Sequence, residues 1–396
     1  MNRDRRRTAL VLSGGGSYAA YEVGVMKALF GGHSPATGYQ PFEPDIIVAS
    51  GAGALNAGVL AAHDERGLVE AVRTLEDIWV NHISEATTGC GNGIYRIRGL
   101  SSEFFNPGCY WSKPLGVLRD AIDDGLRAAV GTASLAVSPL RLLDPLAAFR
   151  LDAFIDVEPL LKSVQQFIPL EGLRNTRQRL RITSTNARTG EIRIFNENDI
   201  ARLGYAPFLA SAALPGFFPP REIEGDPYID ASLLMDTPLR PAFTEAEDLH
   251  VIYMDPNIGR IERTRLQSSV DVFDRIRVVR LAYAINQDIR TARAINRGIK
   301  VMESAGGNGP LTKEDIECFL RTAGRIYRRI TEGKTYSKLT IHRYHPAEDL
   351  GESLGFLNLN VDHVRRMIDR GYHDAVAYDP VKSRSVLPPQ QNHSSE

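Results

Sequence analysis

Cysteine is scarce in this sequence, and its scarcity narrows the class of protein. Only three of the 396 residues are cysteines, at Cys90, Cys109 and Cys318. An odd number at wide spacing predicts neither a disulfide framework nor a zinc cluster, and it is typical of a reducing compartment. No Cys/His spacing for zinc and no Walker-type Gly-Lys-Ser/Thr occurs either. We therefore expect a cytoplasmic protein.

The sequence also lacks a surplus of charge and a long apolar run. Its 47 lysines and arginines balance its 48 aspartates and glutamates, for a net charge of −1. This balance gives no case for nucleic acid as a general partner. No run of about 18 apolar residues is present, so no membrane-spanning helix is expected. The basic N-terminus continues directly into an apolar strand, and we expect no signal peptide.

Residues 8–61 contain the same pattern of strand, glycine-rich turn and helix twice. In each copy a short apolar strand leads into a glycine-rich turn and then into a helix. The two copies have strands at 8–13 and 46–48 and turns at 14–16 and 51–53. Short apolar strands that alternate with helices predict an α/β fold on a mostly parallel sheet.

Three consecutive glycines, Gly14, Gly15 and Gly16, stand where the first helix is expected to begin. Bare backbone N–H groups at the positive end of a helix dipole attract anions. The anion is a phosphate or the oxyanion of an acyl transfer, although glycines also suit tight packing alone. A dinucleotide site would need an acidic residue at the end of the second strand. Asp45 precedes that strand instead, so we disfavour a dinucleotide-binding protein.

The second turn has the form of a nucleophile elbow without its nucleophile. An elbow reads Gly-x-Ser-x-Gly between a strand and a helix, where small residues let the backbone pass closely. Here the five positions read Ala49-Ser50-Gly51-Ala52-Gly53. The strand, the helix and the small residues are in place, but the nucleophile position holds Gly51.

With these two turns the sequence resembles the patatin-like phospholipases, a family of lipid acyl hydrolases. The resemblance covers most of 8–61 and 180–256, and more loosely 340–377. Besides the turns, it rests on segments similar to the family's stretch around the catalytic aspartate, namely 210–220, Tyr-Ile-Asp-Ala-Ser at 228–232 and Thr-Pro-Leu-Arg-Pro at 237–241. Three separated motifs in the family's order are far more specific than any one of them.

The resemblance implies a parallel sheet with helices on both faces and a Ser–Asp dyad served by an oxyanion loop. Carried over by position, Gly14, Gly15 and Gly16 form the oxyanion loop, Asp230 is the dyad base, and Gly51 takes the nucleophile position. The implied partner is an acyl lipid, or a membrane surface contacted peripherally. No metal and no organic cofactor is implied.

Further positions depart from the family pattern. Tyr18 stands where the family has a basic residue, and Ala19, Ala49 and Ala231 stand where it has glycines. Several motifs depart from the family pattern at once, whereas a single engineered substitution would leave the others intact. We therefore favour natural divergence over an engineered Gly51. We therefore expect a lipid acyl hydrolase scaffold that is inactive or much weakened, a pseudoenzyme.

Two alternatives stay open. The chain is an active esterase that uses Ser50 after a shift of one residue, or it is a non-catalytic lipid-binding or regulatory protein. A neighbouring residue in a tight turn points elsewhere, and a misplacement of about 1 Å costs about a hundredfold in rate. We therefore favour the inactive scaffold over an esterase that uses Ser50 as its nucleophile.

We expect a core at 8–256, a mainly helical part at 257–377 packed on it, and a disordered tail at 378–396. A helical insertion at about 100–170 includes the apolar, mildly basic stretch 125–154. This stretch is either a lid that contacts membranes or a helical pair packed on the core, which we favour. The other expected elements are helices at 66–84, 266–304, 312–333 and 361–376, a hairpin at 179–196, and strands at 248–254 and 338–345.

Overall fold

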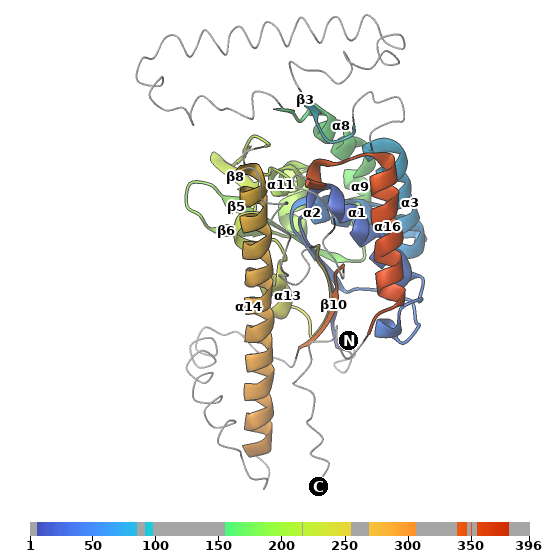
Figure 1. Ribbon diagram of the computed structural model, residues 1–396, viewed down its shortest axis with the longest axis vertical. Helices are drawn as coiled ribbons and strands as arrows, with labels where there is room; N and C mark the ends of the chain where they lie inside the picture. The colour runs from blue at the N-terminus through green and yellow to red at the C-terminus, as the bar shows by residue number, and fades with distance from the viewer. Residues whose placement is uncertain are drawn as a thin grey trace, which may run out of the picture.

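A central sheet of eight strands carries the fold (Figure 1). The computed structural model describes residues 6–84, 92–97, 155–215, 217–254, 269–305, 339–346, 350 and 355–379. The sheet order is β10-β9-β1-β2-β5-β8-β7, with β6 paired to β5. The strands are β1 Thr8–Leu12, β2 Ile46–Ala49, β5 Arg179–Asn186, β6 Ile192–Phe195, β7 Arg221–Ile223, β8 Asp226–Asp230, β9 Asp248–Ile252 and β10 Thr340–Tyr344. A separate antiparallel pair joins β3 Arg96–Ile97 to β4 Ile155–Asp156.

The strands from β10 to β5 are all parallel, whereas β6, β7 and β8 pair antiparallel. This confirms the predicted mostly parallel sheet. The hairpin predicted at 179–196 is the β5–β6 pair. It forms because an alternating apolar pattern flanks a glycine turn, and Gly190 has a positive φ of 74° there.

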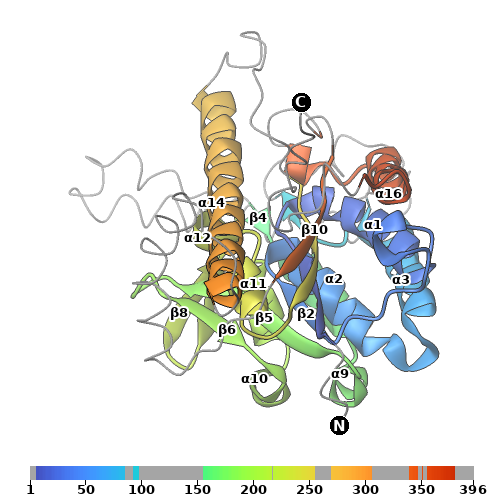
Figure 2. The ribbon, with the colours of Figure 1, turned by 90° about the horizontal axis from the view of Figure 1, so that it is seen from below.

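Helices cover both faces of the sheet, as expected for this fold class. Successive side chains of a strand point to opposite faces, so Leu10 and Leu12 pack in one buried cluster while Ala9 and Val11 pack in another. Figures 1 and 2 show α14 on one side of the sheet and the α1, α2, α3 and α16 group on the other. The helices are α1 Ala20–Phe30, α2 Gly51–Ala62, α3 Leu68–Asp77, α8 Glu158–Phe167, α9 Leu170–Asn175, α10 Glu197–Leu203, α11 Ala206–Ser211, α12 Ser232–Met235, α13 Leu239–Phe243, α14 Ser269–Ala305 and α16 Val361–Val376.

The helices predicted at 66–84, 266–304 and 361–376 form, with one irregularity. α3 continues into a π-helix, Ile78–Ile83, so the predicted first segment is two kinds of helix. α2 begins directly at Gly51, whereas the sequence pattern placed a turn at 51–53. The apolar stretch 125–154, the predicted helix at 312–333, the tail from 380 and the three cysteines lie outside the described residues.

Segments after residue 256 complete the main sheet and its helical layer. β10 pairs with β9 at the sheet edge (Figure 2), and α16 packs along α1. Helix α1 is buried at every position except Lys27, because α16 covers the side that faces away from the sheet. The domain boundary at 256/257 stays a prediction. No helix in the described part of the chain is long and apolar enough to cross a membrane.

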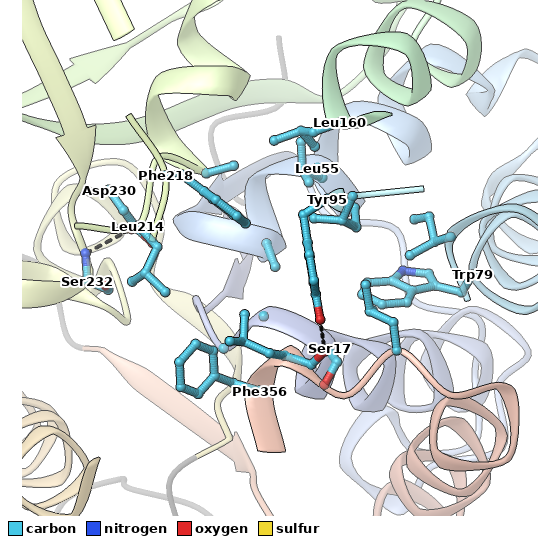
Figure 3. Close-up of a pocket in the computed structure, with 18 of the residues that line it drawn as sticks. Ser17, Leu55, Trp79, Tyr95, Leu160, Leu214, Phe218, Asp230, Ser232 and Phe356 are labelled. Atoms are coloured by element: carbon cyan, nitrogen blue, oxygen red, sulfur yellow. Dashed lines mark hydrogen bonds between the residues drawn. The ribbon is translucent and has the colours of Figure 1, made fainter. Parts of the chain in front are cut away.

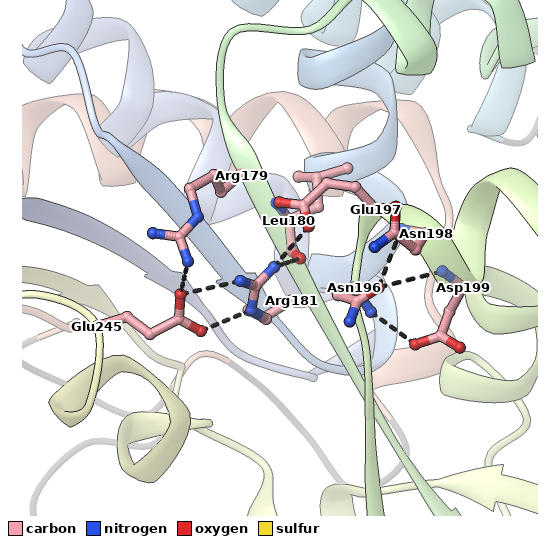
Figure 4. A network of polar contacts seen from close by, with 8 residues as sticks. All are labelled: Arg179, Leu180, Arg181, Asn196, Glu197, Asn198, Asp199 and Glu245. Carbon is pink, nitrogen blue, oxygen red and sulfur yellow. Dashed lines mark hydrogen bonds and ion pairs between the residues drawn. The ribbon is translucent and has the colours of Figure 1, made fainter. Parts of the chain in front are cut away.

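A polar network fixes the end of β5 that lies opposite the glycine turns (Figure 4). Arg181 donates two hydrogen bonds to the Glu245 carboxylate, at 2.6 and 2.9 Å, and one to Glu197 at 2.9 Å. Arg179 also pairs with Glu245. Bidentate guanidinium–carboxylate ion pairs such as Arg181–Glu245 are among the stronger polar contacts in proteins. They join β5 to α10 and to the loop that leads into β9.

Candidate functional site

The two glycine turns meet at one edge of the sheet. β1 and β2 are parallel neighbours in which Leu12 pairs with Ala49, so both chains leave the sheet at the same edge. Ser50 N–H donates to the Leu12 carbonyl at 3.2 Å. A Cβ built on Gly51 would lie only 2.8 Å from the Cα of Gly14. The predicted oxyanion loop and the predicted nucleophile position therefore lie in direct contact.

Gly51 adopts the backbone conformation that a tight strand-to-helix turn requires. Its φ is +57°, in the left-handed region where side chains are strained. Its N–H donates to Ser211 Oγ at 3.0 Å, and that hydroxyl donates to the Thr183 carbonyl at 2.8 Å. Ser211 thus ties the turn to β5. The turn keeps the shape of an elbow although the nucleophile position carries only hydrogen.

Asp230 faces this turn from the last residue of β8. Because β8 runs antiparallel to β5, with Asp230 paired to Ser184, its end reaches the edge where β2 ends. The Asp230 carboxylate accepts a hydrogen bond from Ser232 N–H at 2.9 Å. A Cβ on Gly51 would lie 3.2 and 3.5 Å from the two Asp230 oxygens. The structure therefore brings Gly51 and Asp230 together, as the resemblance implies for a dyad.

The three glycines of the first turn differ in what they do. Gly14 N–H donates to the Asp236 carbonyl at 3.2 Å, so this N–H is engaged within the protein. Gly15 and Gly16 line a cavity beside the turn, with φ of 151° and 59°. A Cβ on Gly16 would lie 2.3 Å from the Phe356 carbonyl oxygen. Glycine is therefore required at Gly16 both by conformation and by close approach.

The cavity is lined mostly by apolar side chains, and Ser17, Asp230, Ser232 and Asp236 are its polar side chains. It encloses about 810 Å³ when its opening to solvent is included. Figure 3 shows Asp230 and Ser232 at one end, and Tyr95, Leu160 and Trp79 further along. Tyr95 Oη donates to the Leu357 carbonyl at 2.7 Å and so closes part of the wall. The apolar lining comprises Ala52, Leu55, Trp79, Ile83, Ile94, Tyr95, Leu160, Ala212, Leu214, Phe218, Phe356, Leu357 and Leu359.

A buried carboxyl group supports the glycine loop from behind. Glu22 accepts hydrogen bonds from Ser13 N–H and from the Asn56 amide, both at 2.8 Å. Trp79 Nε1–H in turn donates to Asn56 Oδ1 at 2.8 Å. Burial raises the pKa of Glu22 well above its ordinary value, although both hydrogen bonds oppose the shift. The network fixes the start of the loop relative to α1, α2 and the π-helix.

Ser50 lies next to Gly51 but outside the cavity. It is fully buried at the N-terminus of α2, and its Oγ has no hydrogen-bond partner in the described part of the chain. Ser50 is absent from the residues that line the cavity. Asp45 lies at the opposite edge of the sheet, where its carboxylate accepts hydrogen bonds from Thr8 N–H and Oγ1. Asp45 therefore lies away from the contact between Gly51 and Asp230, and Ser50 does not line the cavity.

The sequence analysis did not identify two residues that line the cavity near Asp230. Asp236 is buried, lines the cavity, and its Oδ1 would lie 2.4 Å from a Cβ on Gly14. Ala52 lines the cavity at the start of α2. The elbow pattern itself signals Ala52, because the residue after a nucleophile commonly supplies an oxyanion N–H. No sequence pattern signals Asp236, which comes directly after the short helix α12.

A family model and a solved structure were found to be similar to this chain. The model of a family described as patatin-like phospholipase matches residues 10–243. Because that span is more than half of the chain, the protein belongs to the patatin-like phospholipase family. A crystal structure of VipD from Legionella pneumophila is similar over 92% of this chain and 67% of that chain, with 14% identity and a TM-score of 0.32. No curated protein matches the chain.

Proposed function

We propose that this protein binds the acyl chain of a lipid in the cavity beside Gly51, and that it hydrolyses esters weakly or not at all. The observation that carries the proposal is the contact between Gly51 and Asp230. The carboxylate that would act as base faces a position that offers no hydroxyl. Without an oxygen there, no acyl-enzyme forms at this position.

The cavity supports lipid binding. Its lining is mostly apolar with a few polar side chains such as Asp230, as is usual for small-molecule sites. An acyl chain would be buried along Leu55 and Leu160, with its carboxyl or ester group against the N–H groups of Gly15 and Gly16. Peripheral contact with a membrane surface and a cytoplasmic location belong to the same proposal.

Ester hydrolysis tests the missing nucleophile. A short-chain p-nitrophenyl ester is offered to the unchanged protein and to the Gly51→Ser and Gly51→Ala variants, which differ from each other only in a hydroxyl group. We expect no turnover by the unchanged protein and by Gly51→Ala, and slow turnover by Gly51→Ser. The gain is slow because a Cβ would lie 2.8 Å from Gly14 Cα, so the loop must shift to admit the side chain. Adding Asp230→Asn to Gly51→Ser should abolish the gain.

The alternative of Ser50 as nucleophile gives the opposite pattern. In that case the unchanged protein turns over the ester, and Ser50→Ala abolishes the activity. Because Ser50 is buried and does not line the cavity, we expect Ser50→Ala to leave ester turnover unchanged. Turnover that is lost in Ser50→Ala would therefore contradict the proposal.

Lipid binding is tested separately from catalysis. We expect a fluorescent fatty acid to bind the unchanged protein, and Leu55→Arg to weaken binding at least tenfold, because the charge would lie in the apolar part of the cavity. Ile194→Arg is the matched control, since Ile194 is an exposed apolar residue of β6. Equal binding by both variants would place the lipid elsewhere on the protein. No binding by the unchanged protein would contradict the proposal that it binds a lipid.

A further inference from the structure

A second cluster of chemically competent side chains lies on β9 and β10, away from the cavity. Asp248 and His250 are two residues apart on β9, so their side chains leave the same face of the sheet. His342 lies directly opposite His250 in the parallel register of β9 and β10. The strand pairing therefore forces one carboxylate and two imidazoles together. One ligand atom from each of the three lies within 4.8 Å of the other two.

The two imidazole rings are oriented by tyrosine hydroxyls. His250 Nδ1 lies 2.8 Å from Tyr344 Oη, and His342 Nδ1 lies 2.9 Å from Tyr378 Oη. These contacts leave Nε2 of each ring for another partner. His342 Nε2 is 3.3 Å from Asp248 Oδ1. Metal-bound histidines characteristically hold their second ring nitrogen in such an outer hydrogen bond.

The surroundings suit a metal ion that keeps one position open. The rings of His250 and His342 are stacked with centroids 4.6 Å apart, and both residues are buried. The ring of Phe42 packs on the His250 ring with centroids 4.1 Å apart, and it shields that imidazole from solvent. The Asp248 side chain is 30% exposed and gives the cluster a route to solvent.

We propose that Asp248, His250 and His342 bind one divalent transition-metal ion, with zinc preferred, and that the ion ties the edge strand β10 to β9. Two imidazoles and one carboxylate are ligands that zinc accepts, with a solvent molecule in the fourth position. In a tetrahedral zinc site, ligand atoms lie about 3.3 Å apart. The distance between His342 Nε2 and Asp248 Oδ1 already has this value. Magnesium, which prefers oxygen ligands, should not bind.

The ion would connect distant parts of the chain. β10 follows residues 306–338 and pairs only with β9 in the described sheet. Tyr378, which holds His342, comes just after α16. Zinc would thus fix the edge strand and the end of α16 relative to β9, on elements other than those that carry Gly51 and Asp230. The proposal is independent of the lipid-binding function.

Zinc titration of the full chain tests the site. Protein freed of metal by a chelator is titrated with zinc chloride by calorimetry, with magnesium chloride in a parallel titration. We expect one zinc ion per chain, no magnesium binding, and a thermal midpoint raised by several degrees with excess zinc. Asp248→Asn and His342→Gln should each weaken binding at least tenfold. Tyr378→Phe should weaken it about 10- to 100-fold, because it removes an outer hydrogen bond.

Two controls separate this cluster from other ligands. His82→Gln removes an exposed histidine that lies 3.7 Å from Asp77, a surface pair of the same chemistry, and should change nothing. A variant with all three cysteines replaced by serine should still bind one ion. X-ray absorption of the zinc-loaded unchanged protein should show nitrogen and oxygen ligands, and this measurement decides if a variant fails to fold. No zinc binding, sulfur ligands, or binding that survives both Asp248→Asn and His342→Gln would overturn the proposal.

Discussion

At the scale of single residues, Gly51 decides what the proposed lipid site can do. A serine at this position would place a hydroxyl beside Asp230, whereas glycine leaves the carboxylate without a nucleophile to activate. The closeness of Gly14 adds a second obstacle, because the loop occupies space that a side chain would need. The turn at Gly51 therefore offers neither a hydroxyl oxygen nor the room for a side chain.

We predict that Gly51→Ala lowers the free energy of unfolding by about 2–4 kcal/mol, from left-handed strain and overpacking together. Urea denaturation measures this. The matched control is Gly38→Ala, because Gly38 has a similar φ of 62° but nothing within 4 Å of a built Cβ. Gly38→Ala should cost only the strain, about 1 kcal/mol. Equal losses in the two variants would show that Gly14 does not crowd position 51.

We also predict a pH dependence that arises from Glu22. Its pKa is raised in the folded protein, so above the ordinary value of 4.5 the unfolded chain loses this proton while the folded chain keeps it. The contribution of Glu22 to the free energy of unfolding is therefore complete below pH 4.5. It decreases as the pH rises toward the pKa that Glu22 has in the folded protein. Glu22→Gln cannot titrate, but its amide would face the donors Ser13 N–H and Asn56, at a cost of about 1–3 kcal/mol.

The stability advantage of the unchanged protein over Glu22→Gln should consequently shrink as the pH rises above 4.5. Denaturant unfolding of both proteins at a series of pH values from 4.5 to about 8 measures this. Glu65→Gln, at an exposed position, controls for the loss of one carboxyl group. An advantage that grows with pH would mean that the Glu22 pKa is lowered by its hydrogen bonds instead.

At the scale of elements, the contact between α1 and α16 depends on glycines. A Cβ on Gly371 would lie 2.0 Å from the Tyr21 carbonyl oxygen, and one on Gly24 would lie 1.8 Å from that of Ile368. The two helix backbones therefore approach more closely than any side chain allows. This contact holds α1, and with it the glycine loop, against the sheet.

We predict that Gly371→Ala destabilises the protein by about 1–3 kcal/mol through overpacking. The sign is diagnostic, because alanine in place of glycine within a helix normally stabilises by up to about 1 kcal/mol. Thermal unfolding measures it, with Asp369→Ala at an exposed position of the same helix as the control. A stabilised Gly371→Ala variant would show that the helices do not touch at this point.

At the scale of the whole molecule, the fold depends on segments from both ends of the chain. β10 extends the sheet beyond β9, and α16 covers α1. Removing them would expose the edge of β9 and the buried outer side of α1. Exposed sheet edges and apolar helix faces promote aggregation.

We predict that a chain that stops at residue 338 lacks a cooperative thermal transition and aggregates, because both elements are lost. A chain that stops at 379 keeps every described element and is the control. Calorimetry and size-exclusion chromatography of both chains make the comparison. An unchanged transition in the shorter chain would show that the residues after 338 are an appendage on an independent core.

The sequence by itself determined the local plan of this protein. Apolar strands followed by glycines predicted both strand-to-helix transitions and the α/β class, although α2 begins at Gly51 itself, because strand and turn preferences are properties of neighbouring residues. The amphipathic spacing at 361–376 likewise predicted α16 with its observed bounds. The absent hydroxyl at Gly51 is a fact of the sequence alone.

Only the tertiary structure decided which distant residues meet. Strand pairing sets His342 against His250, β8 carries Asp230 to the elbow, and Asp236 reaches Gly14 only through the fold. The burial of α1 also shows this, since α1 is buried at every position except Lys27 and α16, from far along the chain, packs on it. These contacts depend on register and packing between segments far apart in the chain, which local periodicity does not encode.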